Sequence, residues 1–258
     1  MLSYKTINLK TCHLILFFIS IFSLVGCNKN IGASKQSLTP VFFSVCVDTD
    51  DIPRDQNIKS FTDSKTTLIG FKDNMNKIII PAKFSNVYEF NKFGITDVKL
   101  PDDPWRWYKI NKTGKILVQA SFSDNGPDYY VSGFSRFTKN GKIGFVNLQG
   151  NIVVPAKFDW ATPFFFSAPI SIVCIGCAPE AEDLSHKGGC GCDLAIIGGK
   201  WGAIDSTGQL VIPLNYTGYT GDEDNSILLL KGQEKYKINY DNKGKFYIKR
   251  HSVYRNKR

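Results

Sequence analysis

The sequence predicts an all-β protein made of repeated antiparallel units with about three strands each. Four segments of the 258-residue chain align with one another, and a shorter fifth follows them. Their apolar runs last four to six residues and are rich in β-branched and aromatic side chains, which is typical of strands. No stretch sustains a helical i, i+3, i+4 period with capping residues. These observations favour a β-meander that is open, or partly closed like a propeller.

Four of the aligned segments begin with a glycine, and three carry a proline at a recurrent place. They are NKIIIPAKFSNVYEF (76–90), GKILVQASFSDNG (114–126), GNIVVPAKFDWATPF (150–164), GQLVIPLNYTGYT (208–220) and GKFYI (244–248). Their first residues are 38, 36, 58 and 36 residues apart, so one interval holds an insertion of about 22 residues. Each leading glycine suits a turn with positive φ. Each proline should end a strand or lie at a sheet edge, because it lacks an amide donor.

A second recurrent piece precedes each of these segments. Its copies are TLIGFKDN (67–74), RWYKINKT (106–113), KIGFVNLQ (142–149), KWGAIDST (200–207) and KYKINYDNK (235–243). Together the two pieces resemble the WG-repeat family of bacterial proteins, whose units have the form KWGyID-x-x-G-x-x-VIPxxYD. The resemblance covers roughly residues 65–250, is best in 200–213, and departs at Gln119, where proline is expected. It implies a β-repeat fold and no assigned activity.

Stacking between neighbouring units is expected, because one three-stranded sheet cannot bury its apolar face alone. We expect the repeat domain to span 65–250, with a cysteine-rich hairpin insertion at 174–199. Residues 41–64 should supply a leading strand and cap, and 251–258 form a basic tail.

The first residues are typical of a secretory signal. Two lysines precede an uncharged apolar run of about a dozen residues, which is too short to span a bilayer. Leu24-Val25-Gly26-Cys27 resembles the lipobox of bacterial lipoproteins. The resemblance implies cleavage of a signal peptide, 1–26, and lipidation of Cys27, with 27–40 as a flexible tether. It implies an exported protein anchored to the cell envelope by lipid. Asn28 after the cysteine favours the outer membrane, on its periplasmic or surface face, if the cell is Gram-negative.

The net charge of +9 is spread along the chain and is densest in KRHSVYRNKR (249–258). Such a tail usually forms a solvated end, although it is also suited to anionic phospholipid. We expect no nucleic-acid partner, because an exported protein rarely meets nucleic acid.

Four of the seven cysteines lie close together at Cys174, Cys177, Cys190 and Cys192. Facing residues in a hairpin have a constant sum of residue numbers. The pairs Cys174–Cys192 and Cys177–Cys190 agree within one, which one bulge near Gly176 would absorb. We therefore expect two disulfides, because an exported chain meets oxidising conditions. The alternative is zinc bound by the same four sulfurs, with His186 as a spare ligand.

Tryptophans provide the remaining candidate site. Trp201 occupies a slot that holds Ile143 and Tyr236 in other units, so we expect it in the core. Strand alternation places Trp105 and Trp107 on one face, which is a candidate ligand surface.

No catalytic constellation is apparent, since the three histidines lie in the leader, the insertion and the basic tail. The sequence predicts a non-catalytic β-repeat protein, not an enzyme, tethered to the membrane and without a cofactor. It would bind or scaffold an unknown envelope protein or glycan. The alternative is an envelope zinc-binding protein that uses the cysteine cluster.

Overall fold

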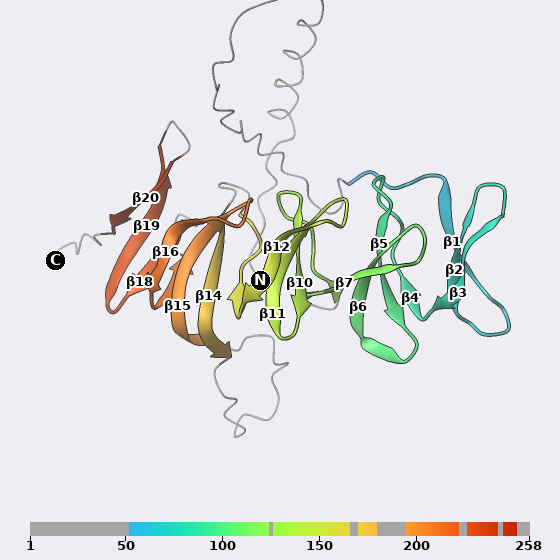
Figure 1. Ribbon diagram of the computed structural model, residues 1–258, viewed down its shortest axis with the longest axis horizontal. Helices are drawn as coiled ribbons and strands as arrows, with labels where there is room; N and C mark the ends of the chain where they lie inside the picture. The colour runs from blue at the N-terminus through green and yellow to red at the C-terminus, as the bar shows by residue number, and fades with distance from the viewer. Residues whose placement is uncertain are drawn as a thin grey trace, which may run out of the picture. The chain divides into compact units, whose positions relative to one another are not determined.

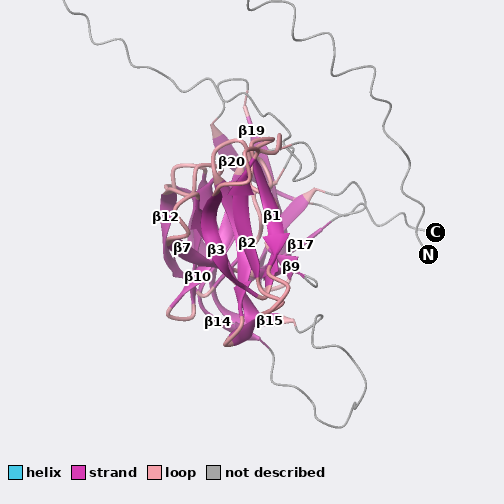
Figure 2. Ribbon diagram, turned by 90° about the vertical axis from the view of Figure 1, so that its right-hand side faces the viewer, coloured by secondary structure: helices cyan, strands magenta, loops and turns pink. Residues whose placement is uncertain are grey.

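The computed structural model describes residues 52–123, 126–165, 170–179, 195–221, 226–241 and 245–251. All of them belong to one compact part of the chain, Phe43–Arg258. They form strands and connecting loops, as Figure 2 shows. In this part of the chain no helix is long and apolar enough to cross a membrane.

The strands form antiparallel sheets whose order follows the chain. The first sheet holds β1 (Ile58–Thr62), β2 (Ile69–Asp73) and β3 (Ile78–Phe84). The second has the order β12-β11-β10-β7-β6-β5-β4. Its strands are β4 (Asn86–Val87), β5 (Ile95–Leu100), β6 (Asp103–Asn111), β7 (Ile116–Ala120), β10 (Phe134–Lys139), β11 (Lys142–Asn147) and β12 (Ile152–Phe158).

Two further four-stranded sheets follow, together with one small pair of strands (Figure 1). The third sheet holds β13 (Trp160–Ala161), β14 (Ile170–Pro179), β15 (Ile196–Asp205) and β16 (Leu210–Tyr216). The fourth holds β17 (Gly218–Gly221), β18 (Ile227–Lys231), β19 (Glu234–Tyr240) and β20 (Phe246–Arg250). β8 (Phe122–Ser123) pairs with β9 (Gly126–Pro127). None of the described sheets closes on itself into a barrel.

Five three-stranded units recur within these sheets, as the sequence predicts. We number them units 1 to 5; they are β1–β3, β5–β7, β10–β12, β14–β16 and β18–β20. A bend follows each proline-containing strand, and a further strand follows the bend. This further strand pairs with the recurrent piece of the next unit and does not add to the sheet of the unit before it. The hairpin expected around the insertion is confirmed, because β14 pairs with β15 from Ile170↔Asp205 to Pro179↔Ile196.

Units 1, 3 and 4 share one register. Phe71 faces Ile80, Phe145 faces Val154 and Ala203 faces Ile212, with register shifts at matching places. The strands β3, β12 and β16 also show the same order of exposed and buried side chains. The identical pattern indicates that each unit folds by the same local rules.

The turn between the last two strands of a unit is closed by an Asx side chain. In unit 4, Asp205 Oδ1 accepts hydrogen bonds from the backbone N of Thr207 at 2.9 Å and of Gln209 at 3.1 Å. Asn147 Oδ1 accepts the equivalent bonds in unit 3. The following glycine, Gly208, has φ of 82°, which confirms the positive φ expected from the sequence.

A second glycine in each of these units is required by close packing of two backbones. A Cβ on Gly70, Gly144 or Gly202 would lie 2.5–2.6 Å from the carbonyl oxygen of the residue before the recurrent proline. The proline-containing strand bulges against its neighbour at this point, and a side chain there would separate the two strands. The glycine on one strand is therefore needed to accommodate the bulge at the proline of the neighbouring strand.

Unit 2 has neither the closely packed glycine nor the recurrent proline. By register, Tyr108 takes the place of the glycine and pairs regularly with Gln119, which takes the place of the proline. The strands that carry proline lie at sheet edges, whereas β7, with Gln119, pairs with β10 of unit 3. Proline cannot donate to a ladder. Its replacement accounts for the fusion of units 2 and 3 into one sheet.

The apolar core is distributed between successive units, which confirms the expected stacking. One cluster joins Phe71 and Ile80 of unit 1 to Val98 and Ile110 of unit 2. A second joins Phe145 of unit 3 to Ile204 of unit 4, and another joins unit 4 to the fourth sheet. Units that lie in different sheets therefore bury their apolar side chains against one another.

Candidate functional site

A groove with a volume of about 820 Å³ lies between β15 and β17. We call it the aromatic groove. Its walls come from the projecting end of the β14–β15 hairpin, from the bend that follows β12, and from the start of the fourth sheet. Its lining residues are Trp160, Pro179, Ala195, Ile196, Ile197, Gly198, Trp201, Thr217, Gly218, Tyr219, Thr220, Gly221 and Leu230.

Three rings form one wall of this groove. The centroid of Trp160 lies 5.5 Å from that of Trp201 and 5.4 Å from that of Tyr219, and Trp201 lies 5.7 Å from Tyr219. Strand pairing produces this cluster, since Cys174 faces Trp160 on one side and Trp201 on the other. Paired residues project from the same face of a sheet, so the two indoles meet across β14.

The indole of Trp201 is fixed in place. Its side chain is buried, with 1% exposure, which confirms the expected core position. Its Nε1 donates a hydrogen bond of 2.7 Å to the carbonyl oxygen of Gly198. Trp160 and Tyr219 are only partly buried and present ring surface to the groove.

β14 and β15 pair without a register shift, so the bulge expected near Gly176 is wrong, and glycines with positive φ shape the hairpin instead. Gly176 has φ of 78°, and its backbone N donates a 2.8 Å hydrogen bond to Asp159 Oδ2. Lys142 also pairs with this carboxylate. The hydrogen bond from Lys142, followed by that from Gly176, lowers the pKa of Asp159 below its usual value. Opposite Gly176, a Cβ on Gly199 would lie 2.5 Å from Cys177 N, so only glycine fits there.

The edge of β15 is open along one side of the groove. β16 pairs with Trp201, Ala203 and Ile204, whereas residues 196–200 have a strand partner only in β14, among the described residues. Unpaired backbone donors and acceptors of such an edge are available to a ligand. The two threonines in the lining, Thr217 and Thr220, add hydroxyl groups.

The groove carries no charged side chain among its described lining residues. Burial raises the pKa of the Tyr219 phenol, with Arg136 acting in the opposite direction, so Tyr219 stays neutral at physiological pH. A site of this kind offers stacking faces and hydrogen bonds without net charge, which suits a neutral ligand better than a polyanion.

The cysteines of the hairpin differ from the expected arrangement. Cys174 is joined to Cys177 by a disulfide, and their Cα atoms lie 6.1 Å apart. Cys174 faces Trp201 and Cys177 faces Gly198, and the expected partners Cys192 and Cys190 lie outside the described residues. The register follows the repeat, since Cys174 occupies the slot of Thr62 in unit 1 and of Thr138 in unit 3.

The zinc alternative falls mostly on residues outside those described. Cys190, Cys192 and His186 lie there, and the disulfide removes the thiolates of Cys174 and Cys177 from the expected ligand set. Over the described ranges, no three side chains of His, Cys, Asp or Glu gather as potential metal ligands.

The expected ligand surface at Trp105 and Trp107 is also wrong. Trp105 is 83% exposed, whereas Trp107 is 4% exposed and packs against Tyr88 at 5.1 Å between ring centroids. The Nζ atom of Lys99 also lies over the ring of Trp107, 4.9 Å from its centroid. The two indoles therefore form no common surface.

Three regions of the chain match the model of the WG containing repeat: residues 69–100, 143–176 and 201–226. These regions are WG repeats. Each begins at the slot of Trp201, which holds Ile69 and Ile143 in the other two. The glycine of the WG repeat is the one whose Cβ would strike the neighbouring backbone. No curated protein matches the chain.

The sequence analysis missed the three-ring wall of the aromatic groove. Trp160 and Tyr219 lie near the ends of the aligned segments 150–164 and 208–220, in the bends that follow β12 and β16, and each sits on the short strand that joins the next sheet. An aromatic residue in both bends is the signal that was available. Their proximity to Trp201 depends on how successive sheets pack, which the repeat pattern alone does not specify.

Proposed function

We propose that this protein is an envelope-tethered, non-catalytic binding protein whose WG-repeat scaffold holds a neutral glycan chain in the aromatic groove. The observation that carries the proposal is the wall formed by Trp160, Trp201 and Tyr219 in a groove of about 820 Å³. This volume lies in the upper part of the range of ligand pockets, about 300–1,000 Å³.

The chemistry of the groove supports a carbohydrate as the occupant. Aromatic side chains present an apolar face that suits the apolar face of a sugar ring, while Tyr and Trp also hydrogen-bond at their polar ends. The open edge of β15 at 196–200 supplies donors and acceptors for sugar hydroxyls, and the Thr220 hydroxyl, which donates to the carbonyl oxygen of Gly221, can accept a further hydrogen bond. The lack of charge among the described lining residues argues against phosphate-rich ligands.

The tether is proposed from the leader. Leu24-Val25-Gly26-Cys27 matches a lipobox, and these residues lie outside the described part of the chain. Lipidated Cys27 would anchor the protein to the envelope, since two or more acyl chains hold a protein stably at a membrane. Replacing Cys27 with Ala should move the protein from the membrane fraction to the soluble fraction of exporting cells. Retention in the membrane fraction would contradict the tether.

Glycan binding can be tested with chitotetraose and the full-length protein in detergent. Isothermal titration should show saturable binding. Trp160→Ala should weaken it at least tenfold, because truncation of a central aromatic contact commonly costs more than about 1 kcal/mol, and about 1.4 kcal/mol is tenfold in affinity. Trp105→Ala is the matched control, since Trp105 is 83% exposed and lies outside the groove.

Equal affinities of wild type and Trp160→Ala, both folded by circular dichroism, would contradict the groove as the site. No binding of chitotetraose or of a panel of neutral oligosaccharides would contradict the glycan itself. Capture of an extended peptide by the open edge of β15, in place of sugar, would point to a protein partner and replace the proposal.

A further inference from the structure

Unit 2 departs from the repeat pattern at a position inside the core. The slot held by Phe71, Phe145 and Ala203 in the WG repeats holds Lys109 in unit 2. Lys109 is fully buried, with 0% exposure. The three WG-repeat matches include none of residues 101–142, which contain this slot. A position that breaks an otherwise consistent pattern is where a functional role is expected.

Lys109 forms a buried ion pair with the preceding strand. Its Nζ donates hydrogen bonds of 3.1 and 3.0 Å to the two carboxylate oxygens of Asp97, directly opposite on β5. The ammonium also lies 4.5 Å from the ring centroid of Tyr130. Burial opposes the charged form, but the attraction of Asp97 outweighs it and raises the pKa of Lys109 to about 12. The lysine is therefore charged at neutral pH.

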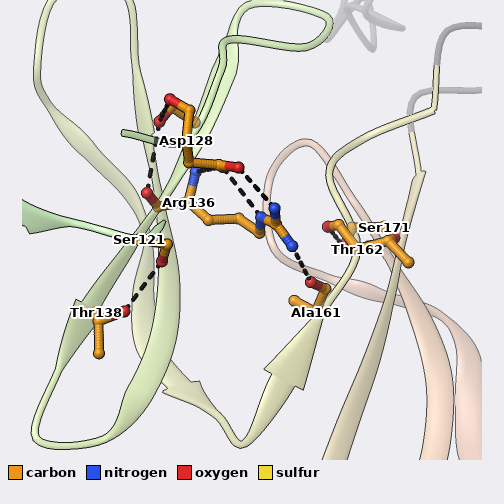
Figure 3. A network of polar contacts seen from close by, with 8 residues as sticks. Ser121, Asp128, Arg136, Thr138, Ala161, Thr162 and Ser171 are labelled. Carbon is orange, nitrogen blue, oxygen red and sulfur yellow. Dashed lines mark hydrogen bonds and ion pairs between the residues drawn. The ribbon is translucent and has the colours of Figure 1, made fainter. Parts of the chain in front are cut away.

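A second charge pair lies beside the first. Arg136 donates from Nη2 to Asp128 Oδ1 at 2.6 Å and from Nε to Asp128 Oδ2 at 3.0 Å, and its Nη1 donates to the carbonyl oxygen of Ala161 at 2.8 Å (Figure 3). The carboxylate of Asp128 is 2% exposed. Each carboxylate therefore has its own cation, and the surroundings carry little net charge.

Both carboxylates border a cavity of about 350 Å³, which we call the unit 2 cavity. Tyr88 and Tyr129, each about half exposed, stand among its lining residues. Tyr130 also lines it and is 5% exposed, and its hydroxyl has no hydrogen-bond partner among the described residues. A buried hydroxyl without a partner is unfavourable, which indicates that the site is completed by something else.

We propose that the unit 2 cavity binds a small neutral hydroxylated molecule of monosaccharide size. Hydroxyl groups both donate and accept, so they can bond to the carboxylates of Asp97 and Asp128 and to the unpartnered Tyr130 hydroxyl. Tyrosine rings suit the apolar face of a sugar. A cation is a poorer match, because Lys109 and Arg136 already compensate the two carboxylates. The volume lies near the lower limit of ligand pockets, about 300 Å³.

A purely structural role explains these features less well. A buried ion pair is often no more stabilising than the apolar residues it replaces, and units 1 and 3 fill the same slot with phenylalanine. Over the described residues, the Tyr130 hydroxyl makes no hydrogen bond that would account for its burial. Binding of a ligand would explain both the buried ion pair of Lys109 and Asp97 and the Tyr130 hydroxyl.

Tyr130→Phe separates the two roles, because it removes only the unpartnered oxygen. We would titrate the full-length protein with glucose, galactose, N-acetylglucosamine and myo-inositol, and follow binding by ligand-observed NMR. At least one should bind the wild type, and Tyr130→Phe should lower that affinity at least tenfold. In the absence of ligand, the Tm of Tyr130→Phe should be unchanged or higher. Tyr247→Phe, on β20, is the matched control and should bind as the wild type does.

Three outcomes would overturn the proposal. The first is that none of the four compounds binds. The second is that choline or Ca²⁺ binds and the four compounds do not. The third is that Tyr130→Phe binds its ligand as tightly as the wild type does. A lower Tm of unliganded Tyr130→Phe would also count against it, because it would show that the hydroxyl has a structural partner. The proposal is independent of the aromatic groove, and Trp160→Ala should retain monosaccharide binding.

Discussion

Replacing Gly202 with Ala should destabilise the protein by forcing two strands apart. The added Cβ would lie 2.5 Å from the carbonyl oxygen of Ile212 and 2.8 Å from that of Pro213. Ordinary contact begins at 3.4 Å, so these backbone atoms must move by about 0.9 Å. Overpacking of this kind costs about 1–3 kcal/mol, and the lower entropy of the unfolded alanine chain offsets about 0.4–1 kcal/mol. We expect a net loss of about 1–2 kcal/mol.

Urea unfolding followed by tryptophan fluorescence measures this loss, because Trp201 is the adjacent residue. Gly221→Ala is the matched control, since no atom lies within 4 Å of its added Cβ and its φ is not positive. It should change the unfolding free energy by less than about 0.5 kcal/mol. Equal stability of the two variants would refute the explanation of the WG glycine by close backbone approach.

Two further predictions concern charged groups. Arg136→Ala should lower the unfolding free energy by about 3–5 kcal/mol, because it leaves the buried Asp128 without its partner; Arg54→Ala, in an exposed pair, should cost less than about 1 kcal/mol. Thermal or urea unfolding of both variants checks this, and similar losses would contradict it. Asp159→Asn should be less stable than the wild type above pH 3.8, the usual pKa of this carboxyl. This difference should disappear as the pH falls through the lowered pKa of Asp159, and a difference constant across acidic pH would contradict the bond from Lys142.

The repeated strands and turns were predictable because their signals are local. The β-branched runs, the glycine after most of the Asx residues and the proline at the strand edges act over a few residues. They identify the units, their expected stacking and the hairpin around the insertion. The departure at Gln119 was also visible, but its consequence was not. That β7 pairs with β10 depends on an edge left available when proline is absent.

The sites were harder to predict because they depend on register and on packing between sheets. The spacing of the cysteines suggested one hairpin register, whereas the repeat fixes another that places Cys174 opposite Trp201. Lys109 looks like an ordinary strand lysine until pairing places Asp97 across from it. Trp107 is buried and Trp105 is exposed because Tyr88 and Lys99 pack against the ring of Trp107. Applying the register of units 1 and 3 to unit 4 would have corrected the cysteine pairing.

The most direct test of the account is to observe the indole Nε1–H signals of the four tryptophans by NMR while chitotetraose is added. Selective replacement of each tryptophan assigns the signals. Binding in the aromatic groove should shift the signals of Trp160 and Trp201 in a saturable way and leave that of Trp105 unchanged. A shift of the Trp105 signal with no change at Trp160 would contradict the proposed site.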